Sequence, residues 1–290
     1  MSRSVRVRGI DIFVEEHGAA RSEPRASEVD AERPLVLVHG FTGFRQDFAP
    51  AIEPLLPAAG RIVTLDLRGH GASTNSGVEA HYTLDALAAD VAATLAALGI
   101  ARCDLLGHSM GGMLAQRVAL AAPERVASLV LLSTSAEPLA WINEDMLALA
   151  ARIGREQGMA KVAEIQRAMA PSDKSRSEPD RRLEREWGAE RFWAWRSARV
   201  AAMDPVAYPA LGRAMKYAAD FRAQLAGIAC PTTVIVGALD AEFVAPSARI
   251  AEAIRGARHI VLPEAAHQPQ LEAPEAFAAA MRAHLAGARG

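Results

Sequence analysis

Six short runs of apolar residues recur along this chain, and most of them are separated by helix-like segments such as 84–98 and 113–121. The runs lie at residues 35–38, 62–65, 104–106, 126–132, 232–236 and 259–262. Strands that are apolar on both faces and alternate with helices are typical of a mostly parallel sheet that helices cover on both sides. The sequence therefore predicts an α/β fold built on such a sheet.

The first residues of the chain predict a β-hairpin at the edge of this sheet. Residues 5–14 alternate with period two around Gly9, which is typical of two antiparallel strands joined by a turn. Residues 19–34 are polar, rich in Ser and Pro and without periodicity, and we interpret them as a solvated loop.

The interval between the fourth and fifth apolar runs departs from the alternation, because it has helix-like pattern and no convincing strand. We therefore predict a core domain of residues 1–135 and 216–290, and a helical cap, or lid, inserted at 136–215. All four tryptophans fall in this interval, and their concentration suggests that a few of them face a substrate cleft. Trp141 and Trp193 are the candidates to line it, together with His108 from the core.

The pentapeptide Gly107-His108-Ser109-Met110-Gly111 lies between an apolar run and a helix-like stretch. Gly-x-Ser-x-Gly between a strand and a helix is the nucleophile elbow, a turn so tight that small residues must flank the serine. The turn holds the serine in a strained conformation and raises its hydroxyl above the end of the sheet. The motif predicts that Ser109 is a nucleophile.

A serine hydroxyl is a poor nucleophile at neutral pH and needs an adjacent base. His267 lies just after the last predicted strand, which returns it to the end of the sheet that carries Ser109. Asp240 follows the preceding strand and would hold the imidazole in the correct tautomer. Glu242 is the alternative acid. The order serine, acid, histidine is the one expected when the serine sits on a strand-to-helix elbow.

The residues after the first core strand predict an oxyanion hole. His39, Gly40 and Phe41 follow that strand directly, so a backbone amide there can point at the reaction centre. We expect the backbone N–H groups of Phe41 and Met110 to stabilise the charge on the substrate oxygen. His39 is expected to brace this loop, and we interpret His70, like His108, as structural.

Composition excludes several classes of partner. The formal net charge is −2, with basic and acidic residues interspersed, so we expect no nucleic-acid partner. No apolar run reaches about 18 residues, the length that crosses a membrane, and the N-terminus lacks the apolar segment of a secretory signal, so we expect a cytoplasmic protein. Cys103 and Cys230 are expected to be small buried side chains. No metal-ligand cluster with recognisable spacing occurs.

Taken together, these motifs resemble the α/β-hydrolase superfamily, in the branch that shares the His-Gly oxyanion loop. The matching segments are residues 39–41, 66–73, 107–112, 237–240 and 266–267. The resemblance implies the α/β-hydrolase fold with an inserted helical cap. It also implies a serine esterase that acts on a small or medium, mostly apolar carboxylic ester through an acyl-enzyme on Ser109. No metal or organic cofactor is expected, and a homo-oligomer is left open.

Several relatives of this fold remain as alternatives. Those that use an aspartate nucleophile, the haloalkane dehalogenases and epoxide hydrolases, are disfavoured by Ser109. Carbon–carbon hydrolases of aromatic catabolism typically have a tryptophan after the catalytic histidine, where this chain has Gln268. They also use a cap arginine for an acidic substrate, for which Arg191, Arg196 and Arg199 are the candidates. Enol-lactonases and perhydrolases fit the same motifs, as does a ligand receptor on a hydrolase fold.

Overall fold

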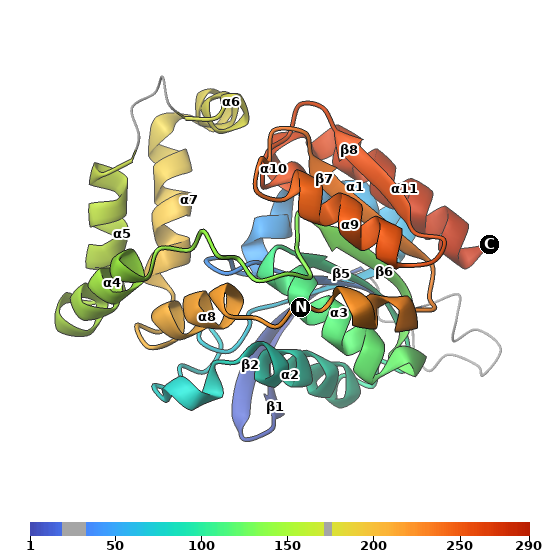
Figure 1. Ribbon diagram of the computed structural model, residues 1–290, viewed down its shortest axis with the longest axis horizontal. Helices are drawn as coiled ribbons and strands as arrows, with labels where there is room; N and C mark the ends of the chain where they lie inside the picture. The colour runs from blue at the N-terminus through green and yellow to red at the C-terminus, as the bar shows by residue number, and fades with distance from the viewer. Residues whose placement is uncertain (19–32, 171–175) are drawn as a thin grey trace.

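The structure is a computed structural model that describes residues 1–18, 33–170 and 176–290. Its described strands form one sheet in the order β1-β2-β4-β3-β5-β6-β7-β8. The pairs β1·β2 and β2·β4 are antiparallel, and every later pair, beginning with β4·β3, is parallel. The predicted hairpin and mostly parallel sheet are therefore confirmed (Figure 1). The loop predicted at 19–34 lies, apart from its last two residues, outside the described residues. The strands are β1 (Ser2–Val7), β2 (Ile10–Gly18), β3 (Leu35–Val38), β4 (Arg61–Leu65), β5 (Cys103–His108), β6 (Val126–Leu132), β7 (Thr232–Gly237) and β8 (Arg258–Leu262).

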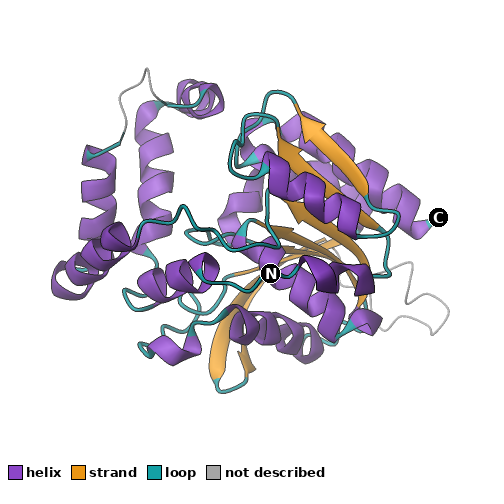
Figure 2. Ribbon diagram, viewed as in Figure 1, coloured by secondary structure: helices purple, strands orange, loops and turns teal. Residues whose placement is uncertain are grey.

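Helices cover both faces of the sheet, as Figure 2 shows. The α-helices are α1 (Ala49–Ala59), α2 (Leu84–Ala97), α3 (Met110–Ala121), α4 (Glu144–Gln157), α5 (Met159–Ala168), α6 (Glu178–Trp187), α7 (Ala189–Ala201), α8 (Ala207–Lys216), α9 (Val244–Ala253), α10 (Pro269–Glu272) and α11 (Pro274–Arg289).

Alternate residues of each central strand belong to two separate cores. In β3, Leu35 and Leu37 join the cluster that α1 and α11 cover, whereas Val36 and Val38 join the cluster that contains residues of α2, α3 and α9. Successive side chains of a strand point to opposite faces of the sheet, so a strand covered on both sides must be apolar throughout. This is why the continuous apolar runs locate the strands.

The last apolar run departs from this rule. In β8, Arg258 and His259 are exposed and Val261 is 43% exposed, so only the end of the strand is buried. The strand lies at the edge of the sheet and pairs with β7 alone. The prediction that every run is covered on both faces is therefore wrong for this strand.

The interval between β6 and β7 contains the helices α4 to α8 and no strand among its described residues. Figure 1 places α4 to α7 beside the sheet rather than on either of its faces. A small cluster that includes Met159, Val162, Val200 and Met203 packs α5 against α7. We call α4 to α8 the inserted helices. The division into a core and a cap domain at residues 136–215 stays a prediction.

The inserted helices are hydrogen-bonded to the loop that follows β8. Arg182 on α6 donates from Nη2 to the backbone carbonyl oxygens of Glu264, at 2.9 Å, and Glu272, at 2.5 Å. These two carbonyls stand at opposite ends of the segment that contains His267. The inserted helices and this loop are therefore joined directly.

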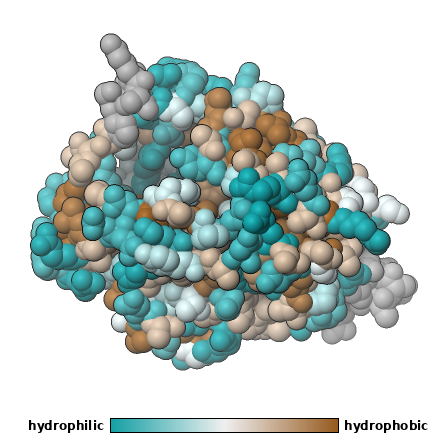
Figure 3. Space-filling view, in the orientation of Figure 1, coloured by the Kyte–Doolittle hydropathy of each residue, from teal (hydrophilic) through white to brown (hydrophobic). Residues whose placement is uncertain are grey.

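Hydrophilic and hydrophobic residues are intermixed on the face seen in Figure 3. Among the helices of the described ranges, none combines the length and the apolar character needed to cross a membrane. Cys103 is buried, as expected, and burial raises the pKa of its thiol to about 12, whereas Cys230 is only partly buried.

Candidate active site

Ser109 occupies the turn between β5 and α3, with φ 54° and ψ −119°. A positive φ is uncommon for a residue with a side chain and is tolerated only where the surroundings enforce it. Here the Ser109 N–H donates to the Leu132 carbonyl at 2.9 Å, and the Thr134 hydroxyl donates to the Ser109 carbonyl at 2.6 Å. Neighbouring chain thus holds both peptide groups of the serine.

The glycines of the pentapeptide are required by close backbone approach. A Cβ at Gly107 would lie 2.2 Å from the carbonyl oxygen of Gly111, and a Cβ at Gly111 would lie 2.3 Å from that of Val38. Both distances are far shorter than a carbon–oxygen contact allows. The geometry of this turn therefore requires glycine at both positions of the Gly-x-Ser-x-Gly pattern.

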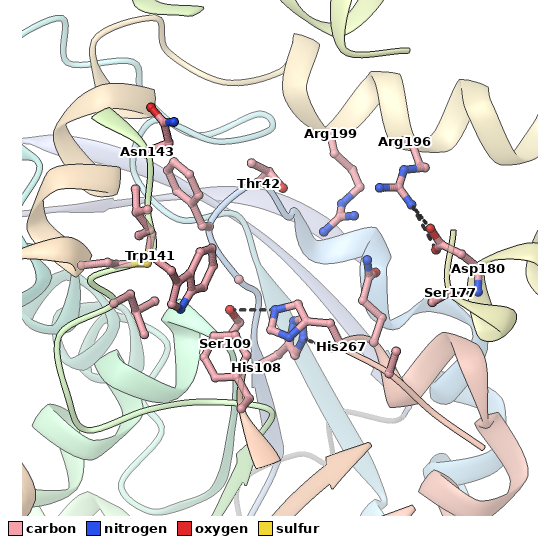
Figure 4. Close-up of a pocket in the computed structure, with 18 of the residues that line it drawn as sticks. Thr42, His108, Ser109, Trp141, Asn143, Ser177, Asp180, Arg196, Arg199 and His267 are labelled. Carbon is pink, nitrogen blue, oxygen red and sulfur yellow. Dashed lines mark hydrogen bonds and ion pairs between the residues drawn. The ribbon is translucent and has the colours of Figure 1, made fainter. Parts of the chain in front are cut away.

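His267 and Asp240 meet Ser109 at the carboxyl ends of the parallel strands, and Figure 4 shows the imidazole of His267 beside Ser109. The Nε2 atom of His267 lies 3.1 Å from Ser109 Oγ, and its Nδ1 lies 2.9 Å from Asp240 Oδ2. Since a carboxylate can only accept, the partners assign the proton to Nδ1 and leave Nε2 to accept from the serine hydroxyl. A hydrogen-bond chain therefore runs from the serine to the carboxylate.

The alternative acid lies elsewhere. Glu242 is exposed, and among the hydrogen bonds of the described residues it has none with His267. Asp240 is 6% exposed, and its backbone carbonyl accepts from the N–H groups of Phe243 and Val244 at the start of α9. The structure brings Asp240, and not Glu242, to the imidazole.

The oxyanion loop lies directly against the elbow. A Cβ at Gly40 would lie 3.1 Å from the Ser109 Cβ, so only a residue without a side chain fits there comfortably. In the ranges that the structure describes, the N–H groups of Phe41 and Met110 have no assigned hydrogen-bond acceptor. Two donors are therefore available where the sequence predicts them.

Two buried histidines, His39 and His70, make hydrogen-bond contacts that hold the oxyanion loop in place. His39 accepts from the Leu67 N–H at 3.0 Å and donates from Nδ1 to the Gly40 carbonyl at 2.8 Å. The His70 Nε2 lies 2.6 Å from the Phe41 carbonyl oxygen. Burial lowers the pKa of both imidazoles, well below the usual value for His39, and we interpret both rings as braces of this loop.

His108 joins the elbow to the loop that carries His267. Its Nε2 donates to the His267 backbone carbonyl at 2.7 Å, and Nδ1 is buried without a partner among the described residues. Burial holds the pKa of His108 well below its ordinary range. The ring is therefore a neutral contact between these two segments.

A cavity of about 600 Å³ lies over Ser109 and His267. Figure 4 shows Trp141 and Asn143 on one side of these residues, with Arg196 and Arg199 reaching in from α7 on the other. The cavity has both apolar and polar lining residues. The apolar ones include Leu139, Trp141, Ile142, Met146, Leu147, Met215 and Phe243, and the polar ones include Asn143, Ser177, Asp180, Arg196, Arg199, Gln268 and Glu272.

Of the residues predicted to line this cavity, His108 and Trp141 do so, and Trp193 does not. Trp193 lines an adjoining cavity that shares Arg196 and Arg199 with the first. Its indole N–H donates to Glu184 at 2.9 Å, and its ring packs edge-on against Phe192 at 5.3 Å. These contacts direct the indole toward Glu184 and Phe192, and the structure places Trp193 at the adjoining cavity rather than at the one over Ser109.

Each of the two arginines at the cavity is paired with an acid. Arg199 is 8% exposed, with its Nη2 3.2 Å from Asp47 Oδ2, and Arg196 donates to both carboxylate oxygens of Asp180. Burial raises the pKa of Asp47 to about 6, although the Arg199 charge opposes the shift. Arg191, the third candidate, is exposed and does not line this cavity.

Sequence reasoning missed Glu272, whose Oε2 accepts from the N–H of Ala266 at 2.7 Å and of Gln268 at 3.1 Å. The side chain is 7% exposed, and burial raises its pKa. It also missed Asp47. Neither carboxylate belongs to a motif or to a hydrophobic period, so the sequence alone carries no signal for them.

Comparison with known proteins identifies the family to which this chain belongs. A family model described as the alpha/beta hydrolase fold matches residues 33–274. The chain is 31% identical over 252 residues to the pimeloyl-(acyl-carrier protein) methyl ester esterase of Aeromonas hydrophila subsp. hydrophila, which covers 84% of this chain and 91% of that protein.

A shorter segment and the whole fold have further likenesses. A stretch of 106 residues, 36% of the chain, is 42% identical to the sn-1-specific diacylglycerol lipase ABHD11 of Xenopus laevis and spans 33% of that protein's length. The crystal structure of the enol-lactonase from Burkholderia xenovorans LB400 superposes with a TM-score of 0.78 at 25% identity, over 98% of this chain and 100% of that chain.

Proposed function

The chain belongs to the α/β-hydrolase family, and from that premise we propose that it is a serine hydrolase that cleaves carboxylic esters. The observation that carries the proposal is the hydrogen-bond chain from Ser109 through His267 to Asp240. A serine on a strained turn, an imidazole within hydrogen-bond reach of it and a buried acid that orients the imidazole are the three parts of nucleophilic acyl transfer.

The reaction follows from the positions of these groups. Ser109 Oγ attacks the ester carbonyl carbon while His267 Nε2 takes its proton, and Asp240 stabilises the imidazolium that forms. The N–H groups of Phe41 and Met110 donate to the tetrahedral oxyanion. The imidazolium then protonates the leaving alkoxide. In the second half, water attacks the acyl-enzyme with His267 again as base, which releases the acid and restores Ser109.

The cavity supports small to medium esters with an apolar part. About 600 Å³ is within the range of sites for small molecules. The apolar side chains of Trp141, Leu147 and Met215, which line the cavity together with Ser109, would contact a hydrocarbon group of the substrate. The methyl ester esterase among the relatives is consistent with this substrate class.

A second candidate is cleavage of an acidic substrate, either a vinylogous diketone at a carbon–carbon bond or an enol lactone. The observation that favours it is the presence of Arg196 and Arg199 among the residues that line the cavity. The likeness to an enol-lactonase agrees with it. Turnover of a carboxylate-bearing enol lactone or diketone, with no turnover of simple esters, would select this candidate.

The test of the first proposal is hydrolysis of p-nitrophenyl esters from acetate to decanoate. We expect turnover with an optimum at one chain length, and a loss of about 10⁴-fold or more in Ser109→Ala because the nucleophile is gone. Ser4→Ala is the matched control, since it removes an exposed hydroxyl on β1. Equal turnover in wild type and Ser109→Ala would end this proposal.

A further inference from the structure

The backbone on both sides of His267 is held by two side chains. Glu272 Oε2 accepts from the N–H groups of Ala266 and Gln268, and His108 donates to the carbonyl of His267 itself. Three successive residues are thus fixed by hydrogen bonds from outside their own backbone. The histidine is the central one.

We propose that Glu272 is a positioning residue, whose buried carboxylate fixes the backbone that aims His267 at Ser109. The inference rests on the function proposed above, in which His267 is the base. It assigns to Glu272 no contact with the reacting atoms.

The local chain geometry makes this role specific. The N–H groups of Leu271 and Glu272 bond to the carbonyl of Gln268 at 2.9 Å each, which closes the short helix α10. The Glu272 side chain then folds back over the same residues to reach the N–H groups ahead of that helix. Hydrogen bonds within segment 266–272 therefore join its last residue, Glu272, to the residues on both sides of His267.

Packing alone does not fix the imidazole. The His267 side chain is 38% exposed, whereas the Ser109 and Asp240 residues are 8% and 6% exposed. Its ring also contacts the ring of Phe243, at 4.7 Å between centroids. Asp240 orients the ring through Nδ1, and the groups that hold the backbone of His267 set where its side chain begins, so both contribute to the position of Nε2.

The position of Nε2 matters because proton transfer needs hydrogen-bond distance. A displacement of about 1 Å in a catalytic group can cost roughly 10²-fold in rate. Burying a carboxylate is unfavourable unless it is hydrogen-bonded, and an apolar side chain here would leave the N–H groups of Ala266 and Gln268 without this acceptor. The carboxylate at this position is explained by the two N–H groups that it satisfies.

Three substitutions at Glu272 separate the acceptor from the charge. Glu272→Gln keeps an oxygen that can accept both N–H groups and removes the charge. Glu272→Met keeps the approximate length and removes the acceptor. Glu272→Asp keeps the charge and is one methylene too short to span both donors. Glu264→Met is the matched control, because that glutamate stands in the same loop with its side chain 80% exposed.

We expect kcat for p-nitrophenyl ester hydrolysis to fall about 10- to 100-fold in Glu272→Met and Glu272→Asp, with KM within about threefold of wild type. Glu272→Gln should keep kcat within about threefold, and Glu264→Met should match wild type. Equal losses in the Gln and Met variants, or no loss in either, would overturn the inference. If the Met variant does not fold, the comparison of Asp with Gln decides the question alone.

Hydrogen exchange at the Ala266 and Gln268 amides is the second readout, and it needs no turnover. Exchange should quicken at least tenfold in Glu272→Met and stay near wild type in Glu272→Gln. Unchanged exchange in the Met variant contradicts the inference whatever the kinetics. A wild-type protein that neither hydrolyses esters nor reacts at Ser109 with a fluorophosphonate would instead refute the proposed function, and the exchange data would still decide the role of Glu272.

Discussion

The Nε2 atom of His267 lies 3.1 Å from Ser109 Oγ although 158 residues separate the two in the chain. The approach is a consequence of strand order, because β5 and β8 run parallel with β6 and β7 between them. The loops that leave the carboxyl ends of parallel strands meet at one edge of the sheet. The serine, the acid and the base therefore meet at the carboxyl ends of the parallel strands, although they are far apart in the chain.

Asp240→Asn should lower kcat for ester hydrolysis by about 10⁴-fold, because an amide no longer fixes the imidazole tautomer or stabilises the imidazolium. Glu242→Gln, two residues away and exposed, should leave kcat within about threefold. Steady-state rates of the two variants on one p-nitrophenyl ester give the comparison. A severe loss at Glu242 with a mild one at Asp240 would transfer the role of the acid.

Gly107→Ala should destabilise the protein by about 1–3 kcal/mol, since the new methyl group would overlap the Gly111 carbonyl and force the turn apart. Turnover should fall as well, because the same turn carries Ser109. Gly287→Ala in α11 is the matched control, as nothing lies within 4 Å of the added carbon there. Urea unfolding should show the control equal to wild type or slightly more stable. A stable, fully active Gly107→Ala variant would contradict the turn geometry.

The buried pair of Asp47 and Arg199 should make stability depend on pH. Burial raises the pKa of Asp47 from 3.8 to about 6, so between these values the folded protein keeps a proton that the unfolded chain has lost. Stability from this group is therefore present at low pH and lost as pH rises toward 6, by on the order of 2–3 kcal/mol. Urea unfolding from pH 4 to 7 should show wild type losing stability relative to Asp47→Asn. If the free energy of unfolding of Asp47→Asn followed that of wild type at every pH, this assignment would be refuted. Asp145→Asn is the control: because this aspartate is exposed, its variant should follow wild type at every pH.

His284 should act in the opposite direction. It is buried between the hydroxyls of Thr233 and Ser128, and burial lowers its pKa from 6.5 to about 4. As pH falls through this range, the unfolded chain takes up a proton that the folded protein does not bind. Stability should then drop by on the order of 3 kcal/mol between pH 6.5 and 4. His284→Gln, which cannot titrate, should remove that part of the acid loss, and an unchanged acid slope would count against it.

The strands and the elbow could be predicted from the sequence because their signals are local. A continuous apolar run such as 126–132 by itself indicates a buried strand. Gly107 and Gly111 indicate that other backbone atoms come too close at these positions for a side chain. The meeting of Ser109, Asp240 and His267 could be inferred as well, since each follows a strand and parallel strands share an edge.

The rest of the site depends on contacts that leave no pattern. Glu272 bonds to backbone N–H groups, which every residue type possesses, so no partner residue identifies it. The exposure of β8 depends on its place in the sheet order, and the run of residues is as apolar as that of a central strand. The indole of Trp193 is directed toward Glu184, and a helical period alone does not distinguish one turn of α7 from the next.

The two hydrogen bonds from Arg182 to the carbonyls of Glu264 and Glu272 bear on how this enzyme family diversifies. The inserted helices therefore do more than line the cavity, because they also hold the loop after β8. If other helices replaced α4 to α8 and had no basic residue at position 182, the carbonyls of Glu264 and Glu272 would lose this donor. The segment around His267 would then be held less firmly. Replacement of the inserted helices would therefore have to be accompanied by changes in the loop after β8, and the two segments are expected to evolve together.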